Sequence, residues 1–359
     1  MAPVRAEQPS VTIGNSAKAS AVWTATDFAK AKPMVKLVNR APSGKAATQL
    51  PNWGPAGVSV GALPTAPGAA KAEQILPPKK ISTSLPGIAP QNFGTNNHPF
   101  TTARVAVSGL NPVVRYPYRP AGKLFFKDGA SSFVCSASII KPRVVVTAAH
   151  CVAAFGEKRF YTNFVFVPGY TNGSGTQWTA SKPIVMSSYF NGTETCTVRG
   201  VVCPNDVAVL IMNDQTAGKI GDVNGYYGYG WNGYGYTSFL GKTTNQLTQL
   251  GYPVALDSGL LMQRNDSLSY IDPANSNNQI IGSLMTGGSS GGPWIVNFGL
   301  APSAPSIAAG QAPNPLVVVG TTSWGYTNTA VKQQGASPFT SNNIVPLVNS
   351  ACNQAPGNC

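Results

Sequence analysis

The sequence has 359 residues, 43% of them hydrophobic and 10% charged, with 38 glycines and 30 prolines. This length allows one large domain or two, and the composition favours strands and turns over a helical bundle. The net charge of +13 would allow contact with nucleic acid, anionic lipid or an acidic polymer, but no basic stripe and no nucleic-acid module is recognisable, which favours diffuse surface charge and no nucleic-acid partner.

Residues 1–95 differ in composition from the rest. They are rich in Ala, Pro, Ser and Lys, lack cysteine, and carry ten Lys/Arg and three Asp/Glu for a net +7, against fifteen and nine, or +6, in the remainder. Val58–Ala70 and Leu76–Pro90 have the Pro and Gly pairs of linkers, and Ala21–Val38 has no clear period. We interpret residues 1–95 as a pro-segment or a flexible basic arm of low order, with a small binding module as the alternative.

Residues 96–359 are predicted to form one β-rich domain, because short apolar runs alternate with Gly, Asn and Pro. This pattern is typical of an antiparallel barrel or sandwich. The runs are Phe133–Ile140, Arg143–Thr147, Phe164–Val167, Val207–Met212 and Leu316–Thr321. Asn-Gly pairs that begin at Asn172, Asn191, Asn224 and Asn232 predict hairpin turns. A short C-terminal helix is expected over Asn343–Asn349.

The tract Asn224–Tyr236 is rich in Gly, Tyr and Trp. It could form an aromatic loop that binds sugar or peptide. We favour the alternative, in which it is a Gly-rich connection whose rings pack on the barrel.

The cysteines indicate an oxidising compartment. There are six, and two pairs stand seven positions apart, Cys196 with Cys203 and Cys352 with Cys359. The chain has only two histidines, His98 and His150, so no cysteine has metal-ligand spacing to a histidine pair. Disulfides in a secreted protein are the better interpretation, and we expect neither a metal nor another cofactor. No apolar run could span a membrane, and no signal core follows Met1, so a secretory signal peptide would have been removed or lie outside this sequence.

One serine stands in a glycine-rich turn, Met285–Trp294, that leads into an apolar run. Glycines reach positive φ and let a substrate backbone approach closely. Such a turn can present the hydroxyl of Ser290 and several backbone N–H groups to one point, as an acyl-transfer nucleophile requires. Considered alone, such a glycine-rich turn favours the alternative, in which it only turns the chain.

A histidine and an aspartate complete a possible triad. His150 ends the apolar strand in Thr147–Cys151, and its competitor His98 lies in a Pro/Asn-rich linker. Imidazole can take and return a proton near neutral pH. Asp206 opens the apolar run that ends at Leu210; a buried acid there is costly unless it is paired, and orienting a histidine would pair it. A plain strand-edge aspartate is the alternative.

Together, in this order, the three motifs and Ser323-Trp324-Gly325 resemble the chymotrypsin-like (trypsin-like) serine peptidases over about residues 100–350. The resemblance implies an all-β fold of two packed six-stranded antiparallel barrels with a short C-terminal helix. It further implies that Ser290 attacks the peptide carbonyl, His150 transfers the proton, Asp206 fixes the histidine tautomer, and the N–H groups of Gly288 and Ser290 form the oxyanion hole.

The same resemblance supplies a disulfide and a substrate edge. The family bridges the pair that corresponds to Cys135 and Cys151; Cys196–Cys203 and Cys352–Cys359 are expected from proximity only. The edge Ser323–Gly325 would pair with the substrate backbone.

A narrower resemblance is to the bacterial secreted glutamyl-endopeptidase branch, whose members carry pro-segments. It rests on Tyr116–Arg119, Gly225–Gly228 and Gly251–Pro253. The pocket departs from that branch, because Thr322 and Ser323 precede Trp324 where a histidine is usual.

Two further departures bear on specificity and activation. Leu284 falls near the pocket base, so Lys or Arg at P1, the residue before the cleaved bond, would find no acid, and we expect an uncharged P1 residue. Ser289 stands where trypsin and chymotrypsin carry an aspartate that binds the new amino terminus, so activation must differ.

The sequence therefore predicts a monomeric, secreted serine endopeptidase, made as a proenzyme, whose partners are protein or peptide substrates. Two other functions stay open. One is a catalytically silent barrel that binds peptide or wall polymer. The other is a basic surface-adhesion protein whose N-terminal arm does the work.

Overall fold

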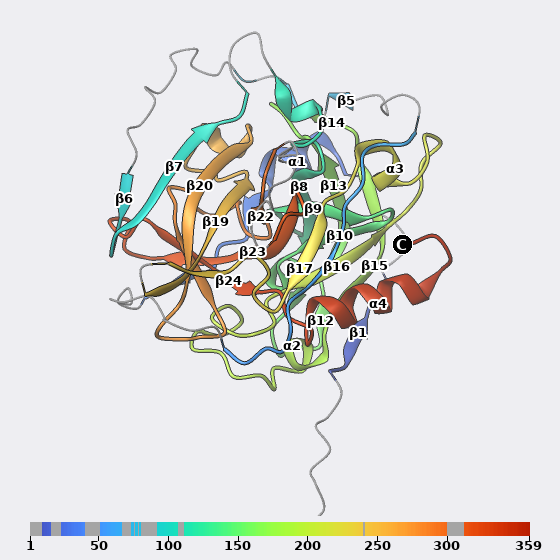
Figure 1. Ribbon diagram of the computed structural model, residues 1–359. Coiled ribbons are helices and arrows are strands. Elements are labelled where there is room, and N and C mark those ends of the chain that lie inside the picture. The colour runs from blue at the N-terminus through green and yellow to red at the C-terminus, as the bar shows by residue number, and fades with distance from the viewer. Residues whose placement is uncertain are drawn as a thin grey trace, which may run out of the picture.

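The computed structural model describes residues 9–15, 23–39, 51–66, 73–74, 76–77, 79, 92–106, 111–239, 241–299 and 312–359. Most of the predicted linker Leu76–Pro90 and the end of the predicted linker Val58–Ala70 lie outside these residues. Two β-barrels pack side by side and make up most of the fold (Figure 1).

The first barrel closes through six antiparallel strands in the order β15-β13-β8-β9-β10-β16, with β16 pairing back onto β15. Its strands are β8 (Ala121–Asp128), β9 (Ser131–Lys141), β10 (Val144–Thr147), β13 (Thr162–Pro168), β15 (Trp178–Met186) and β16 (Ala208–Met212). Strands β10 and β16 are buried throughout, as their unbroken apolar sequences predict.

The second barrel closes through six strands in the order β19-β22-β23-β24-β21-β20, with β20 pairing back onto β19. Its strands are β19 (Lys242–Gly251), β20 (Gln263–Ile271), β21 (Gln279–Gly282), β22 (Pro293–Val296), β23 (Val317–Tyr326) and β24 (Gln333–Pro338). The expected pair of six-stranded antiparallel barrels is confirmed. The expected C-terminal helix is α4 (Ile344–Gln354), which packs on β15 and β16.

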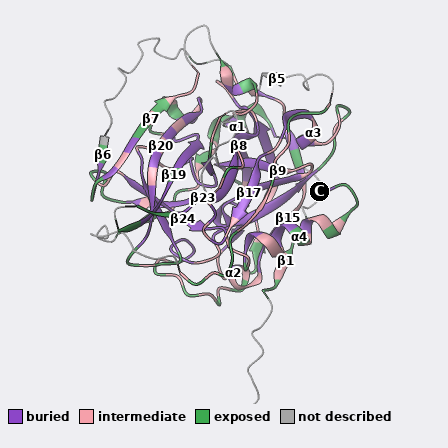
Figure 2. Cartoon of the chain, in the orientation of Figure 1, coloured by how far each residue is buried: buried purple, intermediate pink, exposed green. Residues whose placement is uncertain are grey.

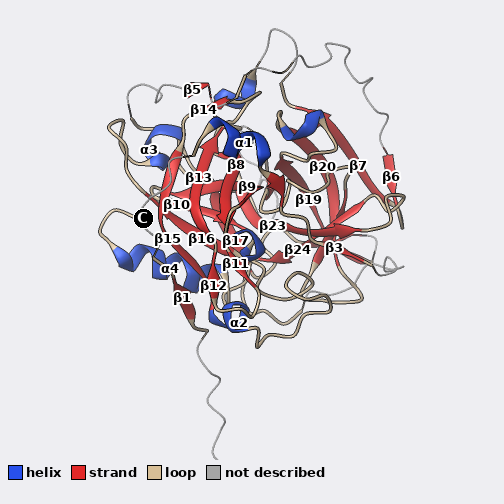
Figure 3. Cartoon of the chain, turned by 180° about the vertical axis from the view of Figure 1, so that it is seen from behind, coloured by secondary structure: helices blue, strands red, loops and turns tan. Residues whose placement is uncertain are grey.

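Shorter elements surround the barrels, and Figure 3 shows the few helices at the periphery. They are α2 (Ser187–Asn191), α3 (Ile220–Asn224), η1 (Pro112–Val114), η2 (Ala149–Cys151), η3 (Asp257–Gly259), β5 (Glu73–Gln74), β6 (Asn92–Gly94), β7 (His98–Arg104), β11 (Ala153–Ala154), β12 (Arg159–Phe160), β14 (Ser174–Gly175), β17 (Gly228–Trp231) and β18 (Thr237–Phe239). Burial is concentrated in the barrel strands (Figure 2). No helix among the described residues is long and apolar enough to cross a membrane.

The described parts of the first 95 residues carry more regular structure than their composition predicts. Besides β5 and β6, these residues form β1 (Val11–Ile13), α1 (Ala25–Lys30), β2 (Lys32–Pro33), β3 (Leu37–Val38) and β4 (Gly57–Ser59). Strand β1 pairs with β15, β2 with β9, β3 with β23 and β4 with β17. Pairing with a strand edge uses backbone groups, so it leaves no side-chain pattern to read from the sequence.

Two of the four Asn-Gly hairpin predictions are wrong. Asn191-Gly192 and Asn224-Gly225 end the helices α2 and α3, where glycine takes φ of 70° and 75°. Positive φ suits the residue after a helix as well as a hairpin, so the dipeptide alone does not separate the two. The pairs at Asn172 and Asn232 form turns with positive φ at both residues.

The aromatic tract Asn224–Tyr236 packs on the barrel, which is the alternative favoured from the sequence. Tyr227, Tyr229, Tyr234 and Tyr236 are all buried.

Candidate active site

His150 and Asp206 are brought together by two neighbouring strands of the first barrel. His150 lies in η2, directly after β10, and Asp206 stands two residues before β16. These strands pair antiparallel, with Thr147 opposite Ala208, so the end of one lies beside the start of the other. His98, the other histidine, is buried in β7 against Tyr270, and burial lowers its pKa to about 4.

The carboxylate of Asp206 holds His150 through two atoms. Nδ1–H of His150 donates to Oδ2 at 2.8 Å, and the backbone N–H of His150 donates to Oδ1 at 2.8 Å. Both side chains are at most 1% exposed. Ser323 Oγ–H also donates to Oδ2, at 2.5 Å. A buried carboxylate needs this number of donors to offset its lost hydration. With its proton on Nδ1, the imidazole has Nε2 free to accept one.

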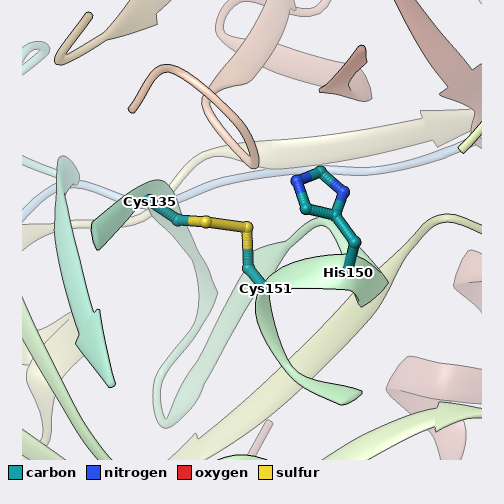
Figure 4. Close-up of side chains that lie close together, drawn as sticks. All are labelled: Cys135, His150 and Cys151. Atoms are coloured by element: carbon teal, nitrogen blue, oxygen red, sulfur yellow. A yellow bond between two sulfur atoms is a disulfide. The ribbon is translucent and has the colours of Figure 1, made fainter. Parts of the chain in front are cut away.

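A disulfide fixes the turn that carries the histidine. Cys135 in β9 is bonded to Cys151, and Figure 4 shows the imidazole of His150 beside this bridge. The three residues lie close enough for metal ligation, but the two sulfurs are bonded to each other and offer no thiolate. The other two expected pairs, Cys196–Cys203 and Cys352–Cys359, are also bonded in the structure.

The turn that carries Ser290 is shaped by glycines and held by both barrels. Gly288 has φ of 97°, and a Cβ there would lie 2.5 Å from the carbonyl oxygen of Tyr252. The N–H of Ser136, in β9, donates to the Ser290 carbonyl at 2.7 Å. Within the described parts of the chain, the N–H groups of Gly288 and Ser290 have no acceptor. They are therefore free to bind an oxyanion.

The hydroxyl of Ser290 points to the chain's own N-terminal region. It donates to the carbonyl oxygen of Met34 at 3.4 Å. Nε2 of His150 has no hydrogen-bond partner among the described residues, so the nucleophile and the imidazole are not bonded to each other.

A buried network behind Ser290 was not foreseen. Ser289 donates to the Thr286 carbonyl at 2.7 Å and accepts from Gln334 Nε2 at 3.1 Å. Gln249 Nε2 donates to Gln334 Oε1 at 2.6 Å, and Ser283 Oγ–H donates to Gln249 Oε1 at 2.9 Å. The sequence singled out Ser289 but could not supply its partners, since the two glutamines lie about forty residues away in either direction.

A cavity of about 360 Å³ opens beside Ser290. Leu284 and Gly325, two of the residues expected to bind substrate, line it together with Met285, Gln333 and Lys332. Lys332 is the one charged side chain that the second barrel contributes to the described lining, and its ammonium donates to the Thr329 carbonyl at 2.7 Å.

Three predicted substrate-binding side chains instead bond inside the protein. Thr322 Oγ accepts from Gln249 and Trp294, Ser323 donates to Asp206, and Trp324 Nε1 donates to Asn278. Thr322 also uses its backbone inside the fold, since its N–H donates to the Gly292 carbonyl at 2.9 Å and its carbonyl accepts from the N–H of Gly291 at 2.7 Å.

The chain is similar to a known protein family and to several proteins of known structure. A family model described as Trypsin matches residues 114–345. The clotting factor G beta subunit of Tachypleus tridentatus is 42% identical over 66 residues, which are 18% of this chain and 21% of that protein, so the chain spans about a fifth of that relative's length.

Among solved structures, the protease Anisep from Arthrobacter nicotinovorans matches with a TM-score of 0.50 and 26% identity, over 66% of this chain and 94% of its own. A Glu endopeptidase matches with a TM-score of 0.47 and 20% identity, over 70% of this chain and 97% of its own.

Proposed function

The chain belongs to the trypsin family of serine endopeptidases, and on this premise we propose that it is a secreted endopeptidase, made as a proenzyme, in which Ser290, His150 and Asp206 hydrolyse peptide bonds. The observation that carries the proposal is the buried pair of His150 and Asp206, in which Nε2 of His150 is free to accept a proton.

The reaction proceeds in two halves. Ser290 Oγ attacks the carbonyl carbon of the substrate while His150 Nε2 takes the hydroxyl proton, and the oxyanion is held by the N–H groups of Gly288 and Ser290. The intermediate collapses to an acyl-enzyme as His150 protonates the leaving amine. Water then attacks the ester with His150 again as base, which releases the acid and restores Ser290. Asp206 keeps the proton of the neutral imidazole on Nδ1 and stabilises the cation.

Residue P1 of the substrate is proposed to be uncharged. The cavity beside Ser290 is lined by Leu284, Met285 and Gln333, and no Asp or Glu is among the described lining residues. A Lys or Arg at P1 would find Lys332 and no counter-charge, so binding it would be costly. Digestion of a peptide library checks this; strict cleavage after Lys, Arg or Glu would contradict it. Membership of this chain in the glutamyl-endopeptidase branch of the family stays a prediction.

Secretion and processing are supported by different features. The three disulfides suit an oxidising compartment, and the basic residues 1–95 suit a pro-segment. We propose that this segment is cut away and that the mature protein acts as a monomer. Sequencing the N-terminus of active secreted protein tests the cut; full activity with residue 1 still attached would show the pro-segment interpretation to be wrong.

The decisive experiment is covalent labelling. A fluorophosphonate should react with Ser290 in the N-terminally processed chain and should leave a Ser290→Ala variant unlabelled. A processed wild-type chain that binds peptide but takes up no label would instead be the catalytically silent barrel.

A further inference from the structure

The proposed active site is covered by a short stretch of the same chain. We infer that residues 32–38, here called the blocking strand, inhibit the enzyme from within by lying in its substrate cleft in the reverse direction. The inference rests on the proposed function and goes beyond it, because it identifies which part of residues 1–95 inhibits and how it resists cleavage.

The blocking strand bonds to both barrels, one on each side of Ser290. Its first half pairs with β9, Lys32 opposite Phe133 and Pro33 opposite Val134, and the N–H of Met34 donates to the Val134 carbonyl at 3.0 Å. Its second half pairs with β23, the edge expected to bind substrate. There the N–H of Gly325 donates to the Lys36 carbonyl at 3.2 Å. The strand therefore uses the backbone groups that a substrate would use.

The middle of the blocking strand lies against the nucleophile and the cavity. The Met34 carbonyl accepts the Ser290 hydroxyl, and Val35 lines the cavity. A Cβ on Gly287 would lie 2.5 Å from Val35 Cγ2 and 3.3 Å from Pro33 Cβ. Because φ of Gly287 is not in the positive region that favours glycine, the glycine here is needed for this close approach and not for the turn.

The direction of the blocking strand explains why it is not a substrate. In acyl transfer, the residue whose carbonyl is attacked places its own side chain in the adjacent pocket. Here the carbonyl belongs to Met34, but the pocket holds Val35, which lies on the leaving-amine side of that carbonyl. The Met34 oxygen also faces the attacking hydroxyl and not the N–H groups of Gly288 and Ser290. An attack in this arrangement would gain no oxyanion stabilisation.

The pairing geometry agrees with a reversed strand. The blocking strand runs parallel to both of its neighbours, β9 and β23. A peptide running the other way would pair antiparallel with the same two edges, and its acyl half would then lie along β23 with its leaving half along β9.

The segments before and after the blocking strand are anchored to the protein. The rings of Trp23 and Phe28 stack with their centroids 4.9 Å apart, and the Phe28 ring packs on Phe125 with a centroid distance of 4.8 Å. Asp27 forms a 2.8 Å ion pair with Lys127. On the other side, β4 pairs with β17. These anchors keep the local concentration of the strand at the cleft high, so weak backbone contacts are enough to hold it there.

Labelling of the uncut, full-length protein tests the inference. Four chains are compared for their rate of reaction with a fluorophosphonate: wild type, Val35→Arg, Met34→Pro and the control Val60→Arg. Val35→Arg adds bulk and a positive charge beside Lys332, and Met34→Pro removes the N–H that bonds to Val134. Each should raise the labelling rate about tenfold, since a lost hydrogen bond and a like charge weaken the strand. Val60 is 61% exposed and outside the cavity, so its variant should match wild type.

The outcomes separate this inference from the proposed function. Equal labelling of wild type, Val35→Arg and Met34→Pro would overturn the blocking strand, while a processed chain that reacts would leave the peptidase intact. A processed chain that never reacts would overturn the peptidase itself. Intact mass measured during long incubation gives a separate check: cleavage between Met34 and Val35 would show substrate-like binding and refute the reversed direction. Circular dichroism checks that the Val35→Arg and Met34→Pro chains are folded.

Discussion

Ser323 Oγ–H donates a 2.5 Å hydrogen bond to Oδ2 of Asp206, the same oxygen that accepts Nδ1–H of His150. The two donors come from different barrels, since Ser323 lies in β23 and His150 follows β10. This bond joins the acid of the first barrel to the second barrel, which also carries the nucleophile. Ser323 is therefore a positioning residue that aligns the two halves of the site.

Ser323→Ala should lower kcat/KM by about tenfold to a hundredfold, since a hydrogen bond to a charged group contributes about 1.5–3 kcal/mol. The loss should fall on kcat, because the side chain of Ser323 points away from the substrate cleft. Ser323→Thr keeps the hydroxyl and should restore most of the rate. An unchanged kcat in the alanine variant, or an equal loss in the threonine variant, would contradict the role.

Asp206→Asn should lower kcat by about 10⁴-fold. The amide would donate to Nδ1 of His150 and move the ring proton to Nε2, where it blocks proton transfer from Ser290. Steady-state hydrolysis of a peptide substrate measures the effect. Asp214→Asn is a matched control, because Asp214 pairs with Arg143 at the surface with its side chain 43% exposed; it should keep full activity. A loss under tenfold at Asp206 would exclude the tautomer argument.

Local motifs singled out His150, Asp206 and Ser290 as candidates because each chemical demand is met within a few residues. A glycine-rich turn, a strand end and an acid at the start of an apolar run are all visible without knowledge of the fold. Some barrel strands, among them β10 and β16, were predicted for the same reason, since burial on both faces leaves unbroken apolar runs. Others, such as β19 and β20, are rich in polar residues and were not predicted.

The direction of Ser323 was not predictable, because strand β23 changes register against β24 between Thr322 and Trp324. Side chains alternate between the two faces of a strand, and a bulge resets that alternation. The blocking strand was missed for another reason. Its pairings join residues 32–38 to strands one hundred to three hundred positions away, and backbone pairing over such distances leaves no signal in composition.

The neutral network around Ser289 leads to a prediction about stability. Ser289→Asp would introduce a carboxylate that is fully buried beside Gln334 and Gln249, where the described contacts contain no cation. Burying an unpaired charge costs several kcal/mol, so this variant should unfold at lower urea concentration than wild type. Ser289→Asn, similar in shape and uncharged, is the control. Equal stability of the two variants would show that a counter-ion reaches Ser289 after all.

Lys123 gives a prediction about stability and pH. It lies buried in β8, where Nζ donates to the Gly259 carbonyl at 2.8 Å and sits 4.9 Å from the Tyr170 ring centroid. Burial lowers the pKa of Lys123 from 10.5 to about 7. Between these pH values the unfolded chain binds more protons than the folded one, so the free energy of unfolding should rise with pH across this window. Below pH 7 both states are protonated, and this group adds no further slope.

Lys123→Met should abolish that rise and should be more stable than wild type at pH 7. A shift of this size corresponds to a few kcal/mol, and the lost bond to Gly259 offsets only about 1 kcal/mol of it. Urea unfolding at pH 7, 8.5 and 10, in a Ser290→Ala background that prevents self-digestion, measures both effects. Lys242→Met is the control, because Lys242 is exposed and its removal should leave the slope unchanged. If wild type and Lys123→Met gain stability equally with pH, the buried ammonium is not the source of the slope.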